Sequence, residues 1–158
     1  MADVATRSGN VDVRVRPIEA RDETRWLELF RDYITFYEAT IAEDVVALTW
    51  RRLLGQSDGM IGLIAVDDQD RPLGIATLVF HRSTWSPTSY CYLEDLFVDP
   101  GVRSAGIGRE LIGAAYAEAD RRGATRVYWA TADTNEAARR LYDKVGELTP
   151  FVQYRRPE

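Results

Sequence analysis

The pattern of apolar and polar residues along the chain predicts six strands and four helices. Runs with the composition or alternation of strands lie at residues 11–16, 60–66, 73–80, 90–99, 126–131 and 148–155. Apolar residues three and four apart predict helices over about 19–38 and 43–54, and a third that ends near residue 122. A fourth is expected after residues 133–136, which have the spacing of a capping box. The resulting order, β-α-α-β-β-β-α-β-α-β, predicts an α/β (α+β) fold with a mixed sheet and helices on both faces.

Composition indicates one globular domain. Residues 1–10 lack periodicity and are expected to be a loose tail, whereas residues 11–158 are long enough to form a single domain with its own core. The net charge of −5 argues against a nucleic-acid partner. A single cysteine and a single histidine exclude an internal disulfide and make a metal cluster implausible. No run reaches the length of a membrane span and no signal peptide is recognisable, so we expect a cytoplasmic protein without a membrane partner.

One stretch, residues 90–112, reads as strand, glycine-containing turn and helix. The turn leaves the first N–H groups of the helix open to a ligand, and these groups suit a phosphate or diphosphate. A P-loop is excluded because Ile107 and Gly108 stand where Lys and Ser or Thr are required. A dinucleotide fingerprint is excluded because Leu111 occupies the position of the third glycine.

The turn Arg103-Ser-Ala-Gly106-Ile-Gly108 fits a third pattern, Arg/Gln-x-x-Gly-x-Gly/Ala. With residues 93–100 before it and residues 135–146 after it, the chain resembles the Gcn5-related N-acetyltransferase (GNAT) superfamily over about residues 11–156. It looks most similar to the polyamine and thialysine acetyltransferases and to the yeast-type histone and polyamine acetyltransferases. The resemblance implies a mostly antiparallel sheet and an enzyme that uses acetyl-coenzyme A as cosubstrate. It assigns coenzyme binding to Leu96, Phe97, Val98, Arg103, Ser104, Ala105, Gly106, Ile107, Gly108, Arg109 and Asn135.

Two carboxylates and one tyrosine are the candidate catalytic groups. Glu94 and Asp95 are adjacent on a strand, so their side chains should point to opposite faces unless the strand bulges. The resemblance implies that Glu94 deprotonates the amine through a water and that both carboxylates serve substrate binding. Asn135 and Tyr142 are seven residues apart and share one face of a helix. The resemblance makes Tyr142 the general acid. The alternatives are that Glu94 is a strand-end carboxylate that simply faces solvent and that Tyr142 is a core residue.

The acceptor is expected to be the primary amine of a small molecule: a polyamine, an amino acid or a related amine. A protein lysine or N-terminal amine and a non-catalytic coenzyme A-binding module remain as alternatives. Cys91 has no histidine nearby in sequence, which favours direct transfer over an acyl-enzyme. His81 is interpreted as a strand-end residue rather than a catalytic one. Alternation in residues 149–155, together with the resemblance, predicts a homodimer.

Overall fold

The computed structural model describes residues 12–103 and 105–158; the predicted tail, Val11 and Ser104 lie outside this range. Five strands form one sheet in the order β1-β2-β3-β4-β5. Their bounds are Arg14–Pro17, Met60–Val66, Pro72–His81, Tyr90–Val98 and Arg126–Tyr128. Neighbours from β1 to β4 run antiparallel, and only β4 and β5 run parallel. The expected mixed, mostly antiparallel sheet is therefore confirmed.

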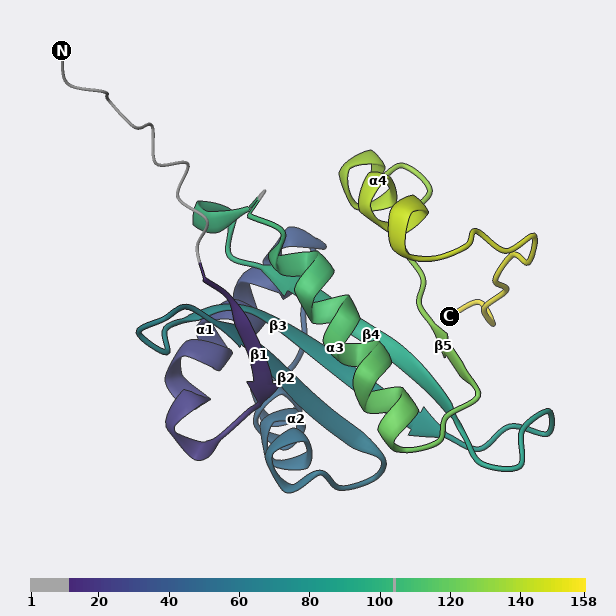
Figure 1. Ribbon diagram of the computed structural model, residues 1–158, viewed down its shortest axis with the longest axis horizontal. Helices are drawn as coiled ribbons and strands as arrows, with labels where there is room; N and C mark the ends of the chain where they lie inside the picture. The colour runs from purple at the N-terminus through teal and green to yellow at the C-terminus, as the bar shows by residue number, and fades with distance from the viewer. Residues whose placement is uncertain (1–11, 104) are drawn as a thin grey trace, which may run out of the picture.

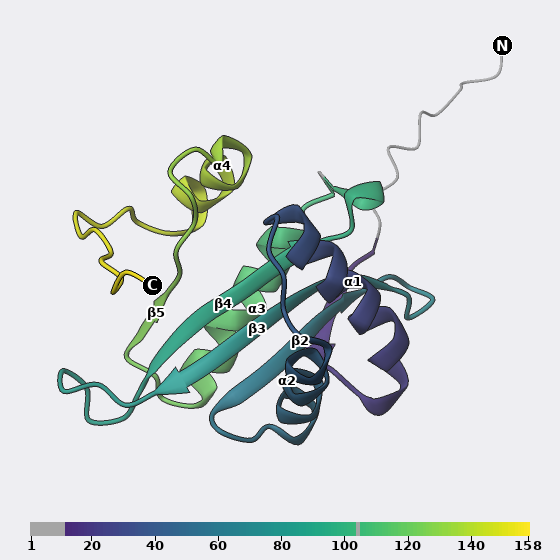
Figure 2. The same cartoon turned by 180° about the vertical axis from the view of Figure 1, so that it is seen from behind.

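Helices cover both faces of this sheet, as the sequence predicts. Helices α1 (Glu23–Phe36) and α2 (Glu43–Gly55) lie on one face, and α3 (Ile107–Arg121) lies on the other (Figures 1 and 2). Short 3₁₀ turns precede α1 at Ala20–Asp22 and follow β4 at Pro100–Val102. Helix α4 (Glu136–Val145) lies beyond β5 at the edge of the molecule (Figure 1).

Each face of the sheet has its own hydrophobic core. Leu63, Leu78 and Leu111 represent the core under α3, whereas Trp26, Trp50 and Ile64 represent the core under α1 and α2. Alternate residues of β2 and β3 enter opposite cores. Both strands are consequently buried almost throughout, which explains why their sequences are continuous apolar runs.

An ion pair fixes the start of α1. Arg16 of β1 donates two hydrogen bonds to Asp22, at 2.7 and 2.9 Å, and also contacts Asp70 in the β2–β3 turn at 3.1 Å. Burial alone would raise the pKa of Asp22, but the hydrogen bonds from Arg16 and from the Glu19 N–H hold it below its usual value. The pairing attaches α1 to the sheet and so determines where the far end of the helix lies.

Two local predictions are wrong. Residues 148–155 do not form a strand: Phe151 and Tyr154 are 86% and 92% exposed. Strand β5 has only three residues, so its outer edge is too short to hold a further strand of this length. The capping box at residues 133–136 is also absent. The side chain of Asn135 accepts a hydrogen bond from the Ala138 N–H, so α4 begins at Glu136 rather than directly after Asp133. No helix in residues 12–103 or 105–158 is both long and apolar enough to cross a bilayer.

Candidate active site

A β-bulge in β4 places both candidate carboxylates on one face of the sheet. Thr77 of β3 pairs with Asp95, but the next residue, Leu78, pairs with Leu93, so Glu94 is an extra residue in β4. Before the bulge Cys91 and Leu93 face α3; after it Leu96 and Val98 do. By this alternation Glu94 and Asp95 both face the side of α1 and α2. The sequence allowed Glu94 and Asp95 to share one face only if their strand bulges, and the structure contains this bulge.

Burial acts on both carboxyl groups, and the charge of Asp95 acts on Glu94 as well. Burial raises the pKa of Asp95, although the hydroxyl groups of Thr77 and Tyr33 favour its charged form. Partial burial and, after it, the negative charge of Asp95 raise the pKa of Glu94. Glu94 remains exposed while Asp95 is half-buried. Glu94 is thus the more accessible group, and the shift of its pKa is in the direction that improves a general base.

Beyond the bulge, one edge of β4 has no partner strand in the described chain. Strand β5 pairs with β4 only through Tyr90, Cys91 and Tyr92, after which the two strands diverge (Figure 1). The backbone of Leu96, Phe97 and Val98 therefore lies along an edge that an extended ligand can join as an added strand would. One acceptor on this edge is occupied, because Arg103 Nε donates to the Val98 carbonyl oxygen at 3.3 Å.

Helix α3 begins at the same end of β4, with Gly106 as its N-cap. Gly106 has a φ of 76°, and a Cβ added there would meet nothing within 4 Å. Glycine is therefore required by backbone conformation, and the space around it is open. Because glycine has no side chain, it cannot cap the first N–H groups of the helix, which stay available to an anion. Ala105 and Arg109 are exposed, Ile107 is buried, and Ser104 lies outside the described residues.

Gly108 has a role that the sequence did not reveal. A Cβ at this position would lie 3.1 Å from Leu141 Cδ2 of α4 and 4.0 Å from Val98 Cγ2 of β4. The missing side chain allows the start of α3, the end of β4 and α4 to meet closely.

Arg103 points toward the α1 side of the site. Its guanidinium lies 5.4 Å from the ring centroids of both Phe36 and Phe97. Its Nε–H donates to the Val98 carbonyl oxygen, as described above. Arg103, which is predicted to bind the diphosphate, therefore contacts β4 and α1 in this structure.

The candidate acid lies on α4. Tyr142 is half-buried and packs edge-on against Trp129, with ring centroids 5.5 Å apart. Burial, with a smaller effect from Tyr37, raises the pKa of Tyr142 to about 12, so the phenol keeps its proton at neutral pH. Asn135 uses its side-chain oxygen as the helix cap, which leaves its amide NH₂ as a donor.

The lone cysteine lies outside this constellation. Cys91 is fully buried on the α3 face, and burial raises the pKa of its thiol to about 11. Such a thiol is a poor nucleophile at neutral pH. Among residues 12–103 and 105–158, no group of three or more His, Cys, Asp or Glu side chains is placed to hold a metal ion.

Several neighbours of the site escaped the sequence analysis. Tyr33 and Thr77 influence Asp95, and His81 contacts Tyr128, although these residues are far apart in the chain. Their proximity follows from the β3–β4 register and from the packing of α1, neither of which a single sequence reveals. The aromatic residues at helical spacing in α1 are the one local signal that could have pointed to Tyr33.

Comparison with known proteins agrees with this architecture. A model of the Acetyltransferase (GNAT) family matches residues 24–146. The D-amino-acid N-acetyltransferase HPA3 of Saccharomyces cerevisiae is 32% identical over 148 residues, which cover 93% of this chain and 92% of the yeast protein. The thialysine N-epsilon-acetyltransferase of Caenorhabditis elegans is 34% identical over 76 residues, 48% of this chain and 47% of that protein.

A solved structure with the same fold is AAC(6')-Iy in complex with the bisubstrate analogue CoA-S-monomethyl-acetylneamine. It has a TM-score of 0.79 at 19% identity, with 92% of this chain and 98% of that chain covered. At this level of identity the likeness concerns the fold.

The family match and the yeast relative show an N-acetyltransferase that depends on acetyl-coenzyme A. The chain belongs to the Acetyltransferase (GNAT) family, as the sequence resemblance indicated.

Asp95→Asn should lower the pKa of Glu94, because the substitution removes a like charge beside it. The titration of the Glu94 carboxyl carbon, followed by NMR, should move to lower pH. Asp68→Asn serves as the control, because it removes an exposed carboxylate of the β2–β3 turn that does not act on the pKa of Glu94. An unchanged Glu94 titration in folded Asp95→Asn would show that the two carboxylates do not interact.

Proposed function

We propose that the protein transfers the acetyl group of acetyl-coenzyme A directly to the primary amine of a small molecule such as a polyamine, an amino acid or a related amine. The observation that carries this proposal is the bulge at Glu94. It sets two carboxylates on the α1 and α2 side of β4, immediately before the unpaired edge of that strand. An ammonium bound there lies close to a base and to an extended cosubstrate at the same time.

The residues present fit a coenzyme. The edge of Leu96, Phe97 and Val98 suits the pantetheine arm. Arg103 and residues 105–109, which lead into α3 and form its first turn, suit the diphosphate, and the Asn135 amide is a further donor. When bound, the cosubstrate supplies a thioester carbonyl carbon for attack and a thiolate leaving group. A free N–H on the β4 edge is then positioned to stabilise the oxyanion that develops.

Glu94 is the proposed base. An alkyl ammonium has a pKa near ~10.4, so it must lose a proton before it can attack. Glu94 takes this proton through a water, because it is exposed and its pKa is raised toward neutrality. Asp95 remains behind it as the carboxylate that holds the substrate ammonium electrostatically.

Tyr142 is the proposed acid. Its raised pKa keeps the proton on the phenol until a strong base, the leaving thiolate, develops nearby. The burial of Cys91 on the opposite face supports direct transfer, because no other thiol exists to form an acyl-enzyme.

The names of the relatives support a small acceptor. They include enzymes named for D-amino acids and thialysine, and a fold neighbour carries an aminoglycoside-derived bisubstrate analogue. We also propose the cytoplasm as the compartment, because a chain with one cysteine forms no internal disulfide and does not depend on an oxidising environment.

Base and acid should be separable by kinetics. In a thiol-release assay with acetyl-coenzyme A and a panel of polyamines, amino acids, aminoglycosides and basic peptides, at least one small amine should be turned over. With that amine, Glu94→Gln should lower kcat/KM at neutral pH by about 10²–10⁴-fold. The deficit should shrink as pH rises, because more of the amine is already deprotonated.

Tyr142→Phe should instead lower kcat and leave the affinity for acetyl-coenzyme A nearly unchanged. The loss of kcat should be modest, because a thiol with a pKa near ~8.5 is a good leaving group without protonation. Asp143→Asn, next to it on α4 and exposed, is the matched control and should behave as wild type. Wild-type rates in both Glu94→Gln and Tyr142→Phe at pH 7 would mean that other groups move the protons.

Gly106→Glu should abolish binding of acetyl-coenzyme A in calorimetry. The new side chain enters the open space at the α3 N-terminus, carries a negative charge toward the diphosphate, and is strained at a positive φ. Gly113→Glu is the control, since Gly113 is also open but lies mid-helix on the exposed side of α3. Wild-type affinity in folded Gly106→Glu would place the coenzyme elsewhere.

We also propose a homodimer built through the C-terminal segment, residues 147–158. Its apolar side chains Leu148, Phe151, Val152 and Tyr154 are 73–92% exposed, and the outer edge of β5 has no partner strand in the described chain. A second copy of the chain can cover these side chains and use that edge.

Light scattering at micromolar concentration should therefore give a dimer mass, and Phe151→Ser with Tyr154→Ser should give a monomer. The matched change Gln153→Ser, between these two aromatic residues, should leave the dimer intact. A monomer mass for the wild-type chain would contradict the assembly and leave the proposed chemistry untouched.

A further inference from the structure

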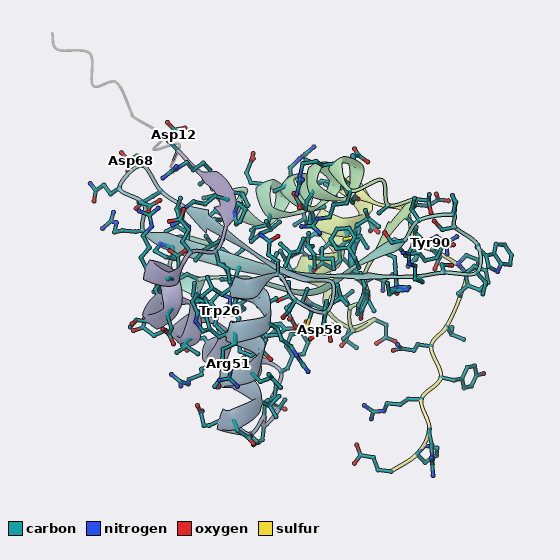
Figure 3. All side chains as sticks on the ribbon, turned by 90° about the horizontal axis from the view of Figure 1, so that it is seen from below. Asp12, Trp26, Arg51, Asp58, Asp68 and Tyr90 are labelled. Carbon is teal, nitrogen blue, oxygen red and sulfur yellow. The ribbon has the colours of Figure 1, made fainter. Side chains whose placement is uncertain are left out.

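Four aromatic side chains form a continuous surface on the part of the sheet that α1 and α2 leave uncovered. They are His81 of β3, Tyr90 and Tyr92 of β4 and Tyr128 of β5, here called the aromatic wall. Their chain neighbours Phe80, Cys91, Leu93 and Val127 pack on the α3 side, so the wall faces the same way as Glu94. Figure 3 shows Tyr90 at the end of the sheet opposite to the end where α1 and α2 enclose Trp26.

The rings of the wall are in mutual contact. Tyr92 and Tyr128 stack with centroids 4.8 Å apart and planes at 30°. His81 meets Tyr90 and Tyr128 edge-on, at 5.8 and 5.7 Å. Tyr128 is nevertheless 36% exposed, so its ring remains accessible to a ligand.

A hydrogen bond fixes the orientation of Tyr128. The Nδ1 of His81 lies 2.8 Å from the Arg82 carbonyl oxygen, which can only accept, so Nδ1 carries the proton. In the neutral imidazole Nε2 is then an acceptor, and the Tyr128 hydroxyl donates to it at 2.6 Å. Tyr128 thus reaches from β5 across β4 to β3, and the bond holds its ring against Tyr92.

The wall has opposite charges at its two ends. Tyr92 precedes Glu94 by two residues on the same face, so the carboxylates stand at one end. At the other end the Arg126 guanidinium lies over the Tyr90 ring at 4.5 Å. No described carboxylate lies within 4 Å of this guanidinium. The span from Tyr90 to Glu94 is about 13 Å of strand, at ~3.3 Å per residue.

We propose that the aromatic wall binds the body of the amine acceptor and that His81 is a positioning residue that holds the Tyr128 ring for this purpose. The wall selects acceptors with an apolar or aromatic body and a far end that is neutral or negative, because Arg126 repels a second ammonium. This inference rests on the proposed function and narrows its range of amines.

The hydrogen bond provides the first test. Tyr128→Phe and His81→Phe each keep a ring but remove the bond, and each should raise the KM for the acceptor about 3- to 10-fold. kcat and the KM for acetyl-coenzyme A should stay near wild type. The acceptor KM of the double variant should not exceed that of the more impaired single variant, because both substitutions remove the same interaction. Thr49→Val is the control: it also removes one side-chain hydroxyl, but one that bonds only the Val45 carbonyl oxygen on α2, outside the wall, and it should behave as wild type.

Three acceptors of similar length test the charge at the far end: 6-aminohexanoic acid, its amide and 1,6-diaminohexane. Wild-type kcat/KM should be lowest for the diamine. Arg126→Gln should improve the diamine and weaken the acid, with the amide unchanged.

Some outcomes would overturn the inference alone. They are a lowered melting temperature with an unchanged acceptor KM in Tyr128→Phe and His81→Phe, or a diamine preferred by wild type. If the enzyme acetylates an amine of the earlier panel but none of the three test acceptors, the inference is overturned as well. No turnover with any amine would overturn the proposed function itself, and the inference with it.

Discussion

One extra residue in β4 determines what this site can do. Without the bulge, Glu94 and Asp95 would alternate across the sheet, and one of them would enter the apolar core under α3. With it, both stay on the side where Tyr33 of α1 contributes a hydroxyl group. The charge of Asp95 then raises the proton affinity of Glu94, which stays exposed to water. A strand irregularity thereby converts two adjacent acidic residues into a single functional pair.

The divergence of β4 and β5 complements the bulge. Three residues of pairing are enough to hold β5 in the sheet, and they end where the carboxylates begin. The freed edge of β4 leads to the start of α3, where Gly106 leaves the first N–H groups uncapped. The aromatic wall lies on the short pairing itself, because Tyr90, Tyr92 and Tyr128 belong to it. Strand β4 therefore connects three regions with different chemistry: an anion site, a proton-transfer site and an aromatic surface.

The sequence predicted the fold well because strands β2 and β3 and helices α1 to α3 carry strong local patterns. A motif indicated which residues are candidates for the site, but it did not show to which face of the sheet their side chains point. The bulge depends on the β3–β4 register, which residues of β4 alone do not encode. The last strand was overpredicted, because alternation in residues 149–155 measures local preference and says nothing about a partner edge. The His81–Tyr128 bond joins residues 47 apart, beyond any local signal.

Helix α4 shows how loosely the candidate acid is attached. None of its residues is fully buried. It packs on the rest of the chain through the half-buried Leu141, Tyr142 and Val145, and the Tyr116 hydroxyl donates to the Val145 carbonyl oxygen at 2.6 Å. Local opening of such an element costs less than global unfolding. In amide hydrogen exchange, α4 would then form a unit of its own that opens while the sheet stays closed. A cosubstrate that bridges β4 and α4 would close that unit, so the acid would be fully in place only in the loaded enzyme.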